Sequence, residues 1–439
     1  MRTLISIAAA ALLAFAACPA LAQDADEPGQ TPRAEQLFRD GKRALLIGEY
    51  DRAIDLLTRA VAEDQTKTSY RVHLARAHIY ADHTDQAESQ LKAVLDATPD
   101  HVEAGQMLAR IHAEHQKWEQ VRDVLKPLLK YRHDYLTYHL LAEACRNLDE
   151  FRHAREYYEE AVKLNPESSI DHYELANIYL GGHFFALAAR SYERALDLGA
   201  DSPVLRYKLG SAYFNLRNYF GRIRRVEIKG GQAGTISGQW FLIEPVPDAK
   251  DTFRAAPADS AIFQIARAMN DGLADRPDIR FLRANIYLNA RRFAQAYDMF
   301  AKLADAIPDE DRALYHFYHA QAAFGIGKYD EYLALLEKAI ELDEDAYAAT
   351  RVEAYLRVAE QYNQRGQLDQ YITYLEKAMA KRPDSADLHL KLGDAYAESR
   401  DYQQAVRQWQ LVLDLEPEHP DRMDLLNRIT RHRSPNNAG

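Results

Sequence analysis

Cysteine is almost absent from this 439-residue sequence, which holds only Cys18 and Cys145. We expect Cys18 to be lost with a leader segment, so one cysteine remains and an internal disulfide is excluded. Basic residues are also in deficit, with 55 Lys and Arg against 66 Asp and Glu and a formal charge of −11. Because nucleic-acid binding is driven by basic surface, this balance disfavours a nucleic-acid partner.

Familiar catalytic motifs are missing as well. The sequence has no His-Glu-x-x-His, no Gly-x-Ser-x-Gly elbow and no phosphate loop ending in Gly-Lys-Ser/Thr. His112 and His115 could chelate a metal from one helical face, but no cluster of carboxylates or cysteines completes a ligand set. We therefore predict no catalytic residue, no cofactor and no metal site, and we favour a binding protein over an enzyme.

One apolar run stands out, at the start of the chain. It extends over residues 4–17, follows Arg2, and precedes the small-x-small sequence Ala20-Leu21-Ala22. The run is shorter than the ~20 residues that a membrane-spanning helix needs. It predicts a signal peptide over residues 1–22 and an exported protein, periplasmic or secreted. Lipidation of Cys18 is the alternative, although Phe15 stands where a lipobox usually has Leu.

What the sequence does contain is a regular period. Small residues recur in steps of 33 or 34 residues, at Gly41, Ala75, Ala109, Ala142, Ala176 and Gly210. Each lies within an apolar set at helical spacing, and about a dozen residues later a second helix begins, as at Ala53, Leu57 and Ala60. A fixed period of this length predicts a solenoid of stacked helical hairpins.

The pattern resembles the tetratricopeptide repeat over about residues 34–419. Repeat starts fall near residues 34, 68, 102, 135, 169, 203, 277, 313, 352 and 386, which gives ten units. The resemblance implies an all-α fold, a right-handed superhelical solenoid of helix-turn-helix repeats. Residues 23–33 are predicted to be a disordered leader, 420–432 a capping helix, and 433–439 a disordered tail.

The period breaks once, in the sixth repeat. From Gly210 to Ala284 is 74 residues, an excess of 40 over one repeat of 34, and the excess has strand and turn residues. We predict a small β-hairpin-like insertion at about 217–257, with the second helix displaced to about 259–273. In this second helix, the position that other repeats fill with a small residue such as Ala53 is taken by Ala261 or Ile262. Residues at about 220–251 are predicted to be dispensable for folding. The insertion is either a tolerated surface loop or a docking element, whose candidate residues are Arg222, Arg224, Arg225, Lys229 and Trp240.

A peptide-binding groove follows from the family resemblance, which implies that the fifth and ninth residues of each unit point into a concave surface. Carried onto this sequence, the central groove residues are His139, Tyr173, Asn177, Tyr207, Ser211, Phe281, Asn285, Phe317 and Gln321. Amide side chains can pair with the backbone of an extended peptide, and aromatic rings add contact area. Truncating Asn177 and Asn285 should then weaken binding and hardly change stability. Alternatively, some of the aromatics are packing residues one turn away.

Three classes of function are compatible with these features. The first is a non-enzymatic scaffold that binds an extended peptide or a partner protein in its concave groove. The second is a structural subunit of an envelope, secretion or polysaccharide-export assembly that docks through the inserted hairpin. An enzyme with its active site at the insertion is the third. Membrane association is expected only through an assembly partner or a lipidated Cys18.

Overall fold

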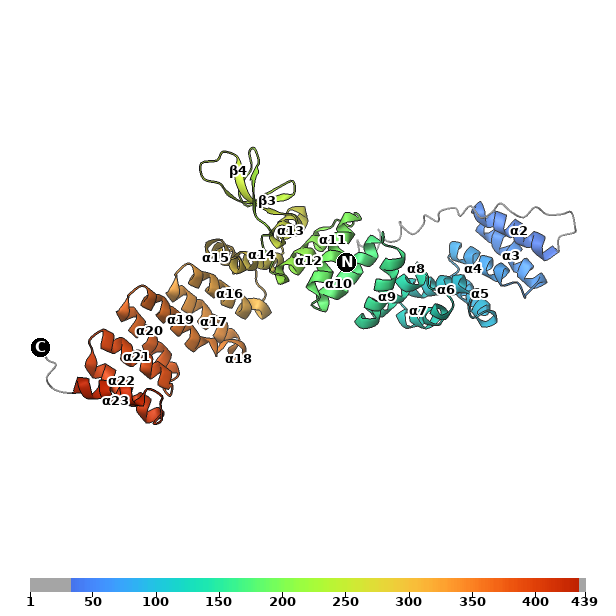
Figure 1. The fold of residues 1–439 in the computed structure, drawn as a ribbon. Coiled ribbons are helices and arrows are strands. Elements are labelled where there is room, and N and C mark those ends of the chain that lie inside the picture. Colours follow the sequence, from blue (N-terminus) through green and yellow to red (C-terminus); the bar gives the residue numbers. More distant parts are fainter. Residues whose placement is uncertain (1–32, 434–439) are drawn as a thin grey trace. The chain divides into compact units, whose positions relative to one another are not determined.

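The computed structural model describes residues 33–433, as paired helices and one small sheet (Figure 1). The chain divides into two compact units, Met1–Pro166 and Glu167–Gly439, and each is described by itself. The predicted signal peptide, nearly all of the leader and nearly all of the tail lie outside the described residues. Arg33 and Arg433 are the exceptions, since they begin α2 and end α23.

The described part of the first unit consists of four helical hairpins. Its elements are α2 (Arg33–Leu46), α3 (Tyr50–Glu63), α4 (Thr68–Tyr80), α5 (Thr84–Ala97), α6 (Val102–Glu114), α7 (Trp118–Leu125), the 3₁₀ segment η1 (Lys126–Lys130), α8 (Tyr135–Asn147) and α9 (Phe151–Leu164). Small residues allow close packing within each hairpin: a Cβ on Gly41 would lie 2.7 Å from Leu57 Cγ. In the third hairpin the second helix gives way to η1, where Pro127 cannot supply a helical N–H.

The described part of the second unit holds six more hairpins and a final capping helix. Its helices are α10 (Ser169–Gly181), α11 (Phe185–Asp197), α12 (Pro203–Asn215), α13 (Ala261–Ala268), α14 (Pro277–Asn289), α15 (Phe293–Ala301), η3 (Asp309–Asp311), α16 (Arg312–Gly325), α17 (Tyr329–Leu342), α18 (Glu344–Tyr347), α19 (Thr350–Gln364), α20 (Leu368–Lys381), α21 (Ala386–Glu398), α22 (Tyr402–Leu415) and α23 (Arg422–Arg433). Together the two units give the ten repeats that the period predicts. The first helices α10, α12, α14 and α16 also contact one another in turn.

The sixth repeat differs most from its neighbours. Its second helix, α13, continues as the π-helical segment η2 (Met269–Leu273), where Gly272 has a φ of 123° that favours glycine. A Cβ on Gly210 would lie 2.8 Å from Ile265, the bulky residue of this repeat. In the preceding repeat the small residue Ala188 comes four positions before the bulky residue Tyr192, and Ala261 comes four positions before Ile265 in the same way. Ala261, and not Ile262, is therefore the small residue of the second helix in the sixth repeat.

The insertion is a four-stranded antiparallel sheet and therefore larger than a hairpin. Its strands are β1 (Arg224–Glu227), β2 (Ile236–Ser237), β3 (Trp240–Pro245) and β4 (Thr252–Pro257), in the order β1-β4-β3-β2. Strand β1 pairs with β4, which is separated from it by two other strands in sequence. Local turn signals between adjacent strands cannot reveal this pairing.

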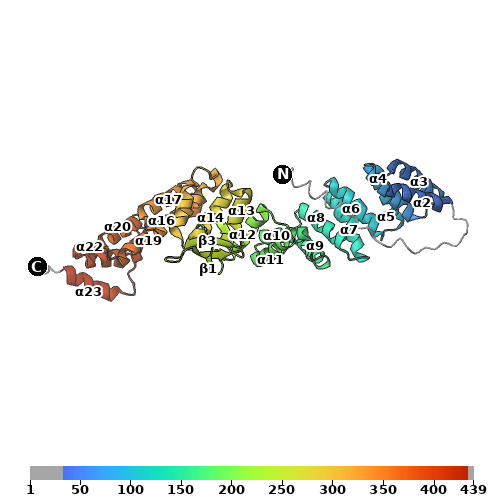
Figure 2. The same cartoon turned by 90° about the horizontal axis from the view of Figure 1, so that it is seen from above.

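The sheet also contributes to the solenoid. Strands β2, β3 and β4 contact α13, and both ribbon views show the sheet beside this part of the chain (Figures 1 and 2). Phe241 is fully buried, and Phe220 packs edge-on against Tyr287 of α14 at 5.4 Å. The opposite face has its own small core of Leu242, Phe253 and Ala255. These contacts argue against the expectation that residues 220–251 are dispensable for folding.

Candidate functional site

The predicted groove residues all lie on first helices of hairpins. His139 belongs to α8 in the first unit, and the other eight belong to α10, α12, α14 and α16 in the second. Eight of the nine are half-buried, and Asn285 is buried with 6% of its surface exposed. His139 stacks on Tyr135 one turn earlier, with ring centres 5.7 Å apart.

Four of the predicted residues meet in one cavity, here called the central hollow. It has a volume of about 570 Å³, and Tyr207, Ser211, Phe281 and Asn285 are part of its lining. Other lining residues stand outside the positions predicted from the sequence, including Asp278, Tyr318 and the connector residues Ile307 and Pro308. Tyr318 directly follows the predicted Phe317, so a helical position shifted by one residue could have found it.

Asn285 is the most unusual group in the central hollow. Its Nδ2 donates to the carbonyl oxygen of Phe281 at 3.1 Å, one turn back on α14. Its Oδ1 is buried and has no hydrogen-bond partner among the described residues. A buried acceptor without a partner costs about 1–3 kcal/mol, because water is lost and nothing replaces it. A ligand that reached this oxygen with an N–H group would therefore satisfy it.

Aromatic residues share the lining of the central hollow with Asn285. Phe281 packs edge-on against Phe300 at 5.7 Å and against Tyr318 at 5.8 Å. Tyr207 lies under the guanidinium of Arg276 at 5.6 Å, and burial, with Asp278 nearby, raises the pKa of its phenol. The central hollow thus combines an apolar, aromatic wall with one buried acceptor.

Asn177 stands at the same repeat position but has three partners. Its Oδ1 accepts the Tyr192 hydroxyl at 2.7 Å and Lys208 Nζ at 2.7 Å, and its Nδ2 donates to Glu174 at 3.1 Å. Tyr173 also accepts from Lys208 at 3.1 Å. A peptide could use Asn177 only by replacing these bonds, so its role in binding stays a prediction.

A spacing of 15 residues explains the difference between the two asparagines. Tyr192 lies 15 residues after Asn177, whereas the equivalent residue after Asn285 is Phe300, which has no hydroxyl to donate. The same spacing recurs where Trp409 Nε1 donates to Asp394 Oδ1 at 2.9 Å. At Asn177 and Asp394 the bulky residue therefore donates to the ninth position of the repeat, whereas Phe300 leaves Asn285 without such a donor.

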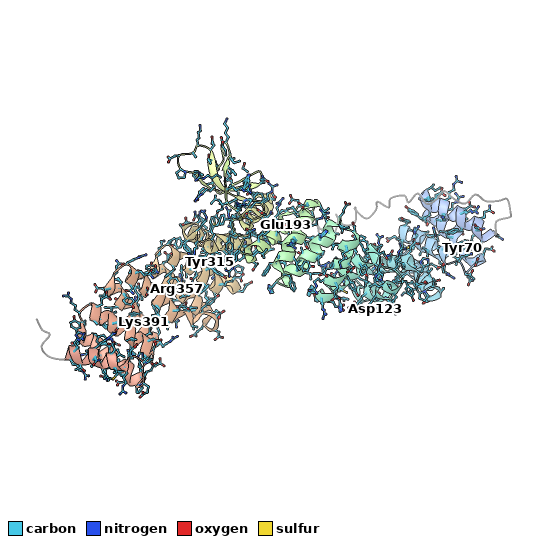
Figure 3. The ribbon with its side chains drawn as sticks, viewed as in Figure 1. Tyr70, Asp123, Glu193, Tyr315, Arg357 and Lys391 are labelled. Carbon is cyan, nitrogen blue, oxygen red and sulfur yellow. The ribbon has the colours of Figure 1, made fainter. Side chains whose placement is uncertain are left out.

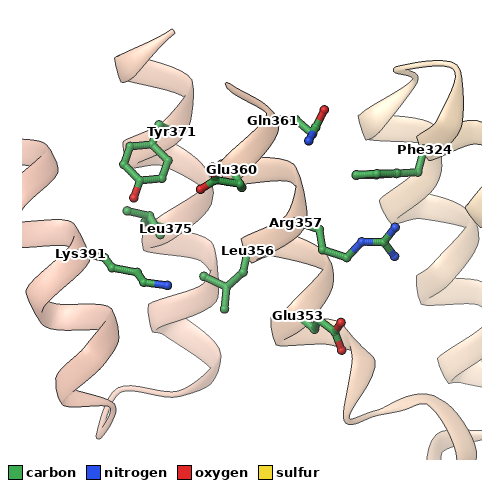
Figure 4. Close-up of a pocket in the computed structure, with 9 residues that line it drawn as sticks. All are labelled: Phe324, Glu353, Leu356, Arg357, Glu360, Gln361, Tyr371, Leu375 and Lys391. Atoms are coloured by element: carbon green, nitrogen blue, oxygen red, sulfur yellow. The ribbon is translucent and has the colours of Figure 1, made fainter. Parts of the chain in front are cut away.

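Phe317 and Gln321 lie outside the lining of the central hollow. Phe317 stacks on Tyr347 at 5.0 Å, and Gln321 accepts from Arg357 at 2.9 Å. Arg357 in turn lines a second cavity of about 390 Å³, with Phe324, Glu353, Glu360 and Lys391 around it (Figure 4). Figure 3 shows where Arg357 and Lys391 lie in the second unit. Both signs of charge are present in this cavity, and the Arg357 guanidinium lies 4.3 Å from the Phe324 ring centre.

The candidate docking residues of the insertion differ in exposure. Arg222, Arg224, Arg225 and Lys229 are all exposed, and two of them lie on β1, an edge strand of the sheet. None of the four forms an ion pair within residues 33–433. Trp240 is half-buried and packs against the core of the sheet, so it contributes to folding of the insertion.

Other reactive side chains are enclosed by the repeats. Cys145 is 1% exposed, and burial raises the pKa of its thiol to about 12. His112 is also buried, while His115 Nδ1 bonds to the carbonyl oxygen of Ile111 at 2.8 Å. Among the described residues no group of three or more His, Cys, Asp or Glu side chains is placed to hold a metal ion. None of the described helices is long and apolar enough to cross a bilayer.

The stacked helical hairpins place this chain in the class of helical-repeat proteins. Three tetratricopeptide-repeat sequence profiles match the chain: one at residues 44–101 and 81–145, a second at 135–168, and a third at 173–219 and 362–420. The chain belongs to the tetratricopeptide-repeat family. Its repeats support a scaffold for protein–protein interaction. The matches leave out residues 220–361, where the inserted sheet, η2 and α18 depart from the repeat.

Solved structures with a similar fold include several of MamA. MamA 41-end from Desulfovibrio magneticus RS-1 is 18% identical, with a TM-score of 0.36, and the alignment covers 39% of this chain and 97% of that one. The structure titled MamA AMB-1 P212121 is 22% identical, with a TM-score of 0.35, and covers 39% and 96%. No curated protein matches the chain.

Proposed function

We propose that this protein is a scaffold that binds an extended segment of a partner protein in the central hollow. The observation that carries the proposal is the Asn285 Oδ1, which is buried at the wall of the hollow with no partner. A peptide in extended conformation presents backbone N–H groups at regular intervals, and one of them would satisfy this acceptor. The aromatic wall of Tyr207, Phe281 and Tyr318 would cover the peptide's apolar side chains.

Site-specific crosslinking tests this proposal. Leu314 lines the central hollow and is 38% exposed, so it can be replaced by a photoreactive p-benzoylphenylalanine. Leu411, with 40% exposure on α22, is the matched control position. We expect one dominant partner protein to be crosslinked at position 314 and none at position 411. Equal labelling at the two positions would count against the central hollow as the binding site.

The identified adduct then allows a quantitative test. A peptide from the crosslinked region should bind the purified protein, and Asn285→Ala should weaken it about fivefold to tenfold, the effect of one hydrogen bond. Ser211 and Phe281 remain in place in this variant. Unchanged affinity would contradict the role given to the Asn285 oxygen.

We further propose that the scaffold acts outside the cytoplasm, in the periplasm or as a secreted protein. The support is the apolar run at residues 4–17 followed by Ala20-Leu21-Ala22, which is typical of an export signal. N-terminal sequencing of the mature protein should begin at Gln23. Intact Met1 in the cytosol would contradict export, and a lipidated Cys18 would replace it with membrane anchoring.

A second candidate function is docking in a larger envelope assembly through the inserted sheet. It is favoured by the four exposed cations of the insertion, which have no ion-pair partner in the described chain although the protein is acidic overall. Charged edge strands also prevent pairing between copies of one protein, so the test must separate the two roles. Arg224→Glu with Arg225→Glu should abolish co-purification with the assembly, whereas Lys250→Glu, also exposed on the insertion, should not.

A further inference from the structure

A small cavity with three cationic side chains lies where the end of the sixth repeat meets the seventh. It has a volume of about 240 Å³ and is lined by Met269 of η2, Arg280 and Arg283 of α14, Met299 of α15, and Lys302 and Leu303. We call it the cationic hollow. No carboxylate is part of its lining, although the whole chain carries an excess of acidic residues.

Arg283 is the central cation and is poorly satisfied. Its guanidinium donates to Met269 Sδ at 3.8 Å and, over a long 3.5 Å, to the carbonyl oxygen of Gly234, and the hydroxyl of Tyr287 is a further neutral partner. Its Nε is buried without any partner in the described chain. The guanidinium also lies 5.7 Å from the centre of the Phe241 ring, a contact that attracts the cation but does not neutralise its charge. A guanidinium offers five N–H donors, and none of the partners of Arg283 carries a charge, so its positive charge is left for an anion to neutralise.

The two other cations are also incompletely neutralised. Lys302 is exposed and forms no ion pair within residues 33–433. Arg280 has a carboxylate at 3.5 Å, that of Asp275, whose side chain is fully in solvent. An exposed pair of this length contributes little and is easily exchanged. The field of the cationic hollow therefore favours a negatively charged group.

The remaining lining decides what else the ligand must carry. Met269, Met299 and Leu303 form apolar surface next to the three cations. Methionine side chains adapt to irregular apolar ligands because they are flexible and polarizable. The volume is below the ~300 Å³ at which pockets for drug-sized ligands begin. A short alkyl chain with one acidic head matches both the charge and the space.

We propose that the cationic hollow binds a small amphipathic anion, whose carboxylate or phosphate head contacts Arg283 and Lys302 and whose alkyl chain lies on the two methionines. This site is separate from the central hollow and does not depend on peptide binding there. Arg283 also contacts the inserted sheet through Phe241 and Gly234, so the bound head group lies beside the junction of sheet and solenoid.

Methionine methyl NMR gives a readout from the site itself. The chain has six methionines, of which Met269 and Met299 line the cationic hollow, while Met107 and Met379 lie elsewhere in the described chain. Full-length protein with ¹³C-methyl methionine is titrated with octanoate, with octyl phosphate and with neutral octanol. We expect saturable shifts of Met269 and Met299 with one or both anions, no comparable shift with octanol, and no shift of Met107 or Met379. The stronger of the two anions identifies the head group.

Two variants complete the test. Lys302→Gln removes an exposed charge, so it should fold normally and weaken binding about fivefold. Arg283→Gln should weaken binding further. Lys250→Gln, an equal charge change on the insertion away from the hollow, should have no effect. The proposal is overturned if octanol binds as well as the anions, if neither methionine shifts, or if Lys302→Gln binds with unchanged affinity.

Discussion

Lys208 Nζ lies 2.7 Å from Asn177 Oδ1 and 5.0 Å from the centre of the Tyr173 ring. Lys208 belongs to α12 and the other two residues to α10, so the contact joins the first helices of adjacent repeats. The same amide oxygen accepts the hydroxyl of Tyr192, a side chain that is fully buried in α11. Asn177 is therefore a structural junction between three helices.

This junction predicts that Asn177→Ala destabilises the central repeats, contrary to the expectation from the sequence that truncating Asn177 hardly changes stability. The Tyr192 hydroxyl would be left buried without a partner, which costs about 2 kcal/mol. Hydrogen exchange measured on peptides of α10, α11 and α12 reports this local stability directly. Asn147→Ala, which changes an exposed amide bonded only to the Glu143 carbonyl, is the matched control. Equal protection in the two variants would contradict the junction.

Asn285 predicts the opposite result at the same repeat position. Asn285→Leu removes an unsatisfied buried acceptor and keeps the branched shape and the number of side-chain heavy atoms, so the stability of α14 should be unchanged or rise by about 1 kcal/mol. The same exchange measurement on α14 peptides checks this. A loss of protection as large as that of Asn177→Ala would mean that Asn285 is as fully engaged as Asn177.

The close approach of helices in the last repeat predicts the effect of one methyl group. A Cβ on Gly393 would lie 2.6 Å from Trp409 Cδ1, so Gly393→Ala should cost about 1–3 kcal/mol through displaced packing. At Gly181, near the end of α10, no atom lies within 4 Å of an added Cβ. Gly181→Ala should therefore stabilise its helix by about 0.5–1 kcal/mol. Thermal unfolding compares both variants with the native protein.

Burial of His319 predicts a loss of stability in mild acid. The side chain is 6% exposed, and its burial, opposed by the nearby Glu331, lowers the pKa of the imidazole from 6.5 to about 4. The unfolded chain therefore binds more protons than the folded chain between these pH values. The stabilisation is complete above pH 6.5 and is lost as the pH falls towards 4, by about 2 kcal/mol between pH 7.5 and pH 5. Hydrogen exchange in α16 should show this difference.

His319→Gln should make the stability of α16 nearly independent of pH over that range, because the group that titrates has been removed. His153→Gln, on the surface of the first unit, should leave the pH dependence of α16 as it is in the native protein. If His319→Gln keeps the full native dependence, another group is responsible.

The inserted sheet predicts a local folding defect when it is removed. Helix α13 is buried along nearly its whole length, with Ile262, Phe263 and Ile265 among the buried residues, because strands cover one side of it. Replacing residues 222–257 by a short Gly-Ser linker should unprotect α13 and α14 while α2 to α9 stay unchanged. Native exchange rates in α13 after the deletion would show that the sheet is only an appendage.

The repeats could be predicted because each hairpin is encoded within about 34 residues. Gly41 and Leu57, or Gly393 and Trp409, are local partners at a fixed spacing, so a period in the sequence reports them directly. The four-stranded sheet was predicted only as a hairpin. Its edge strand β1 pairs with β4 across two other strands, and no local pattern carries that information.

The sequence predicts which helices carry the candidate groove residues, but it does not predict the hydrogen bonds that each side chain makes. Tyr207, Ser211, Phe281 and Asn285 were found from their place in the repeat, and they do share one hollow. The difference between Asn177 and Asn285 depends on the residue 15 positions later, Tyr192 or Phe300. A rule that considers each repeat position alone cannot predict this difference. A tyrosine at a bulky packing position does, however, indicate a buried hydroxyl that needs an acceptor.

The interrupted sixth hairpin has a consequence for how the chain folds as it is synthesised. Each of the other hairpins can close within seconds of leaving the ribosome, since its second helix follows its first directly. Helix α12 ends at Asn215 and its partner α13 begins at Ala261, 46 residues later. At ordinary elongation rates this delay is about two to nine seconds. During it α12 can pack on α11, but the face around Gly210 that packs against Ile265 of α13 stays uncovered, so the nascent chain is most exposed to aggregation and to chaperones at this point.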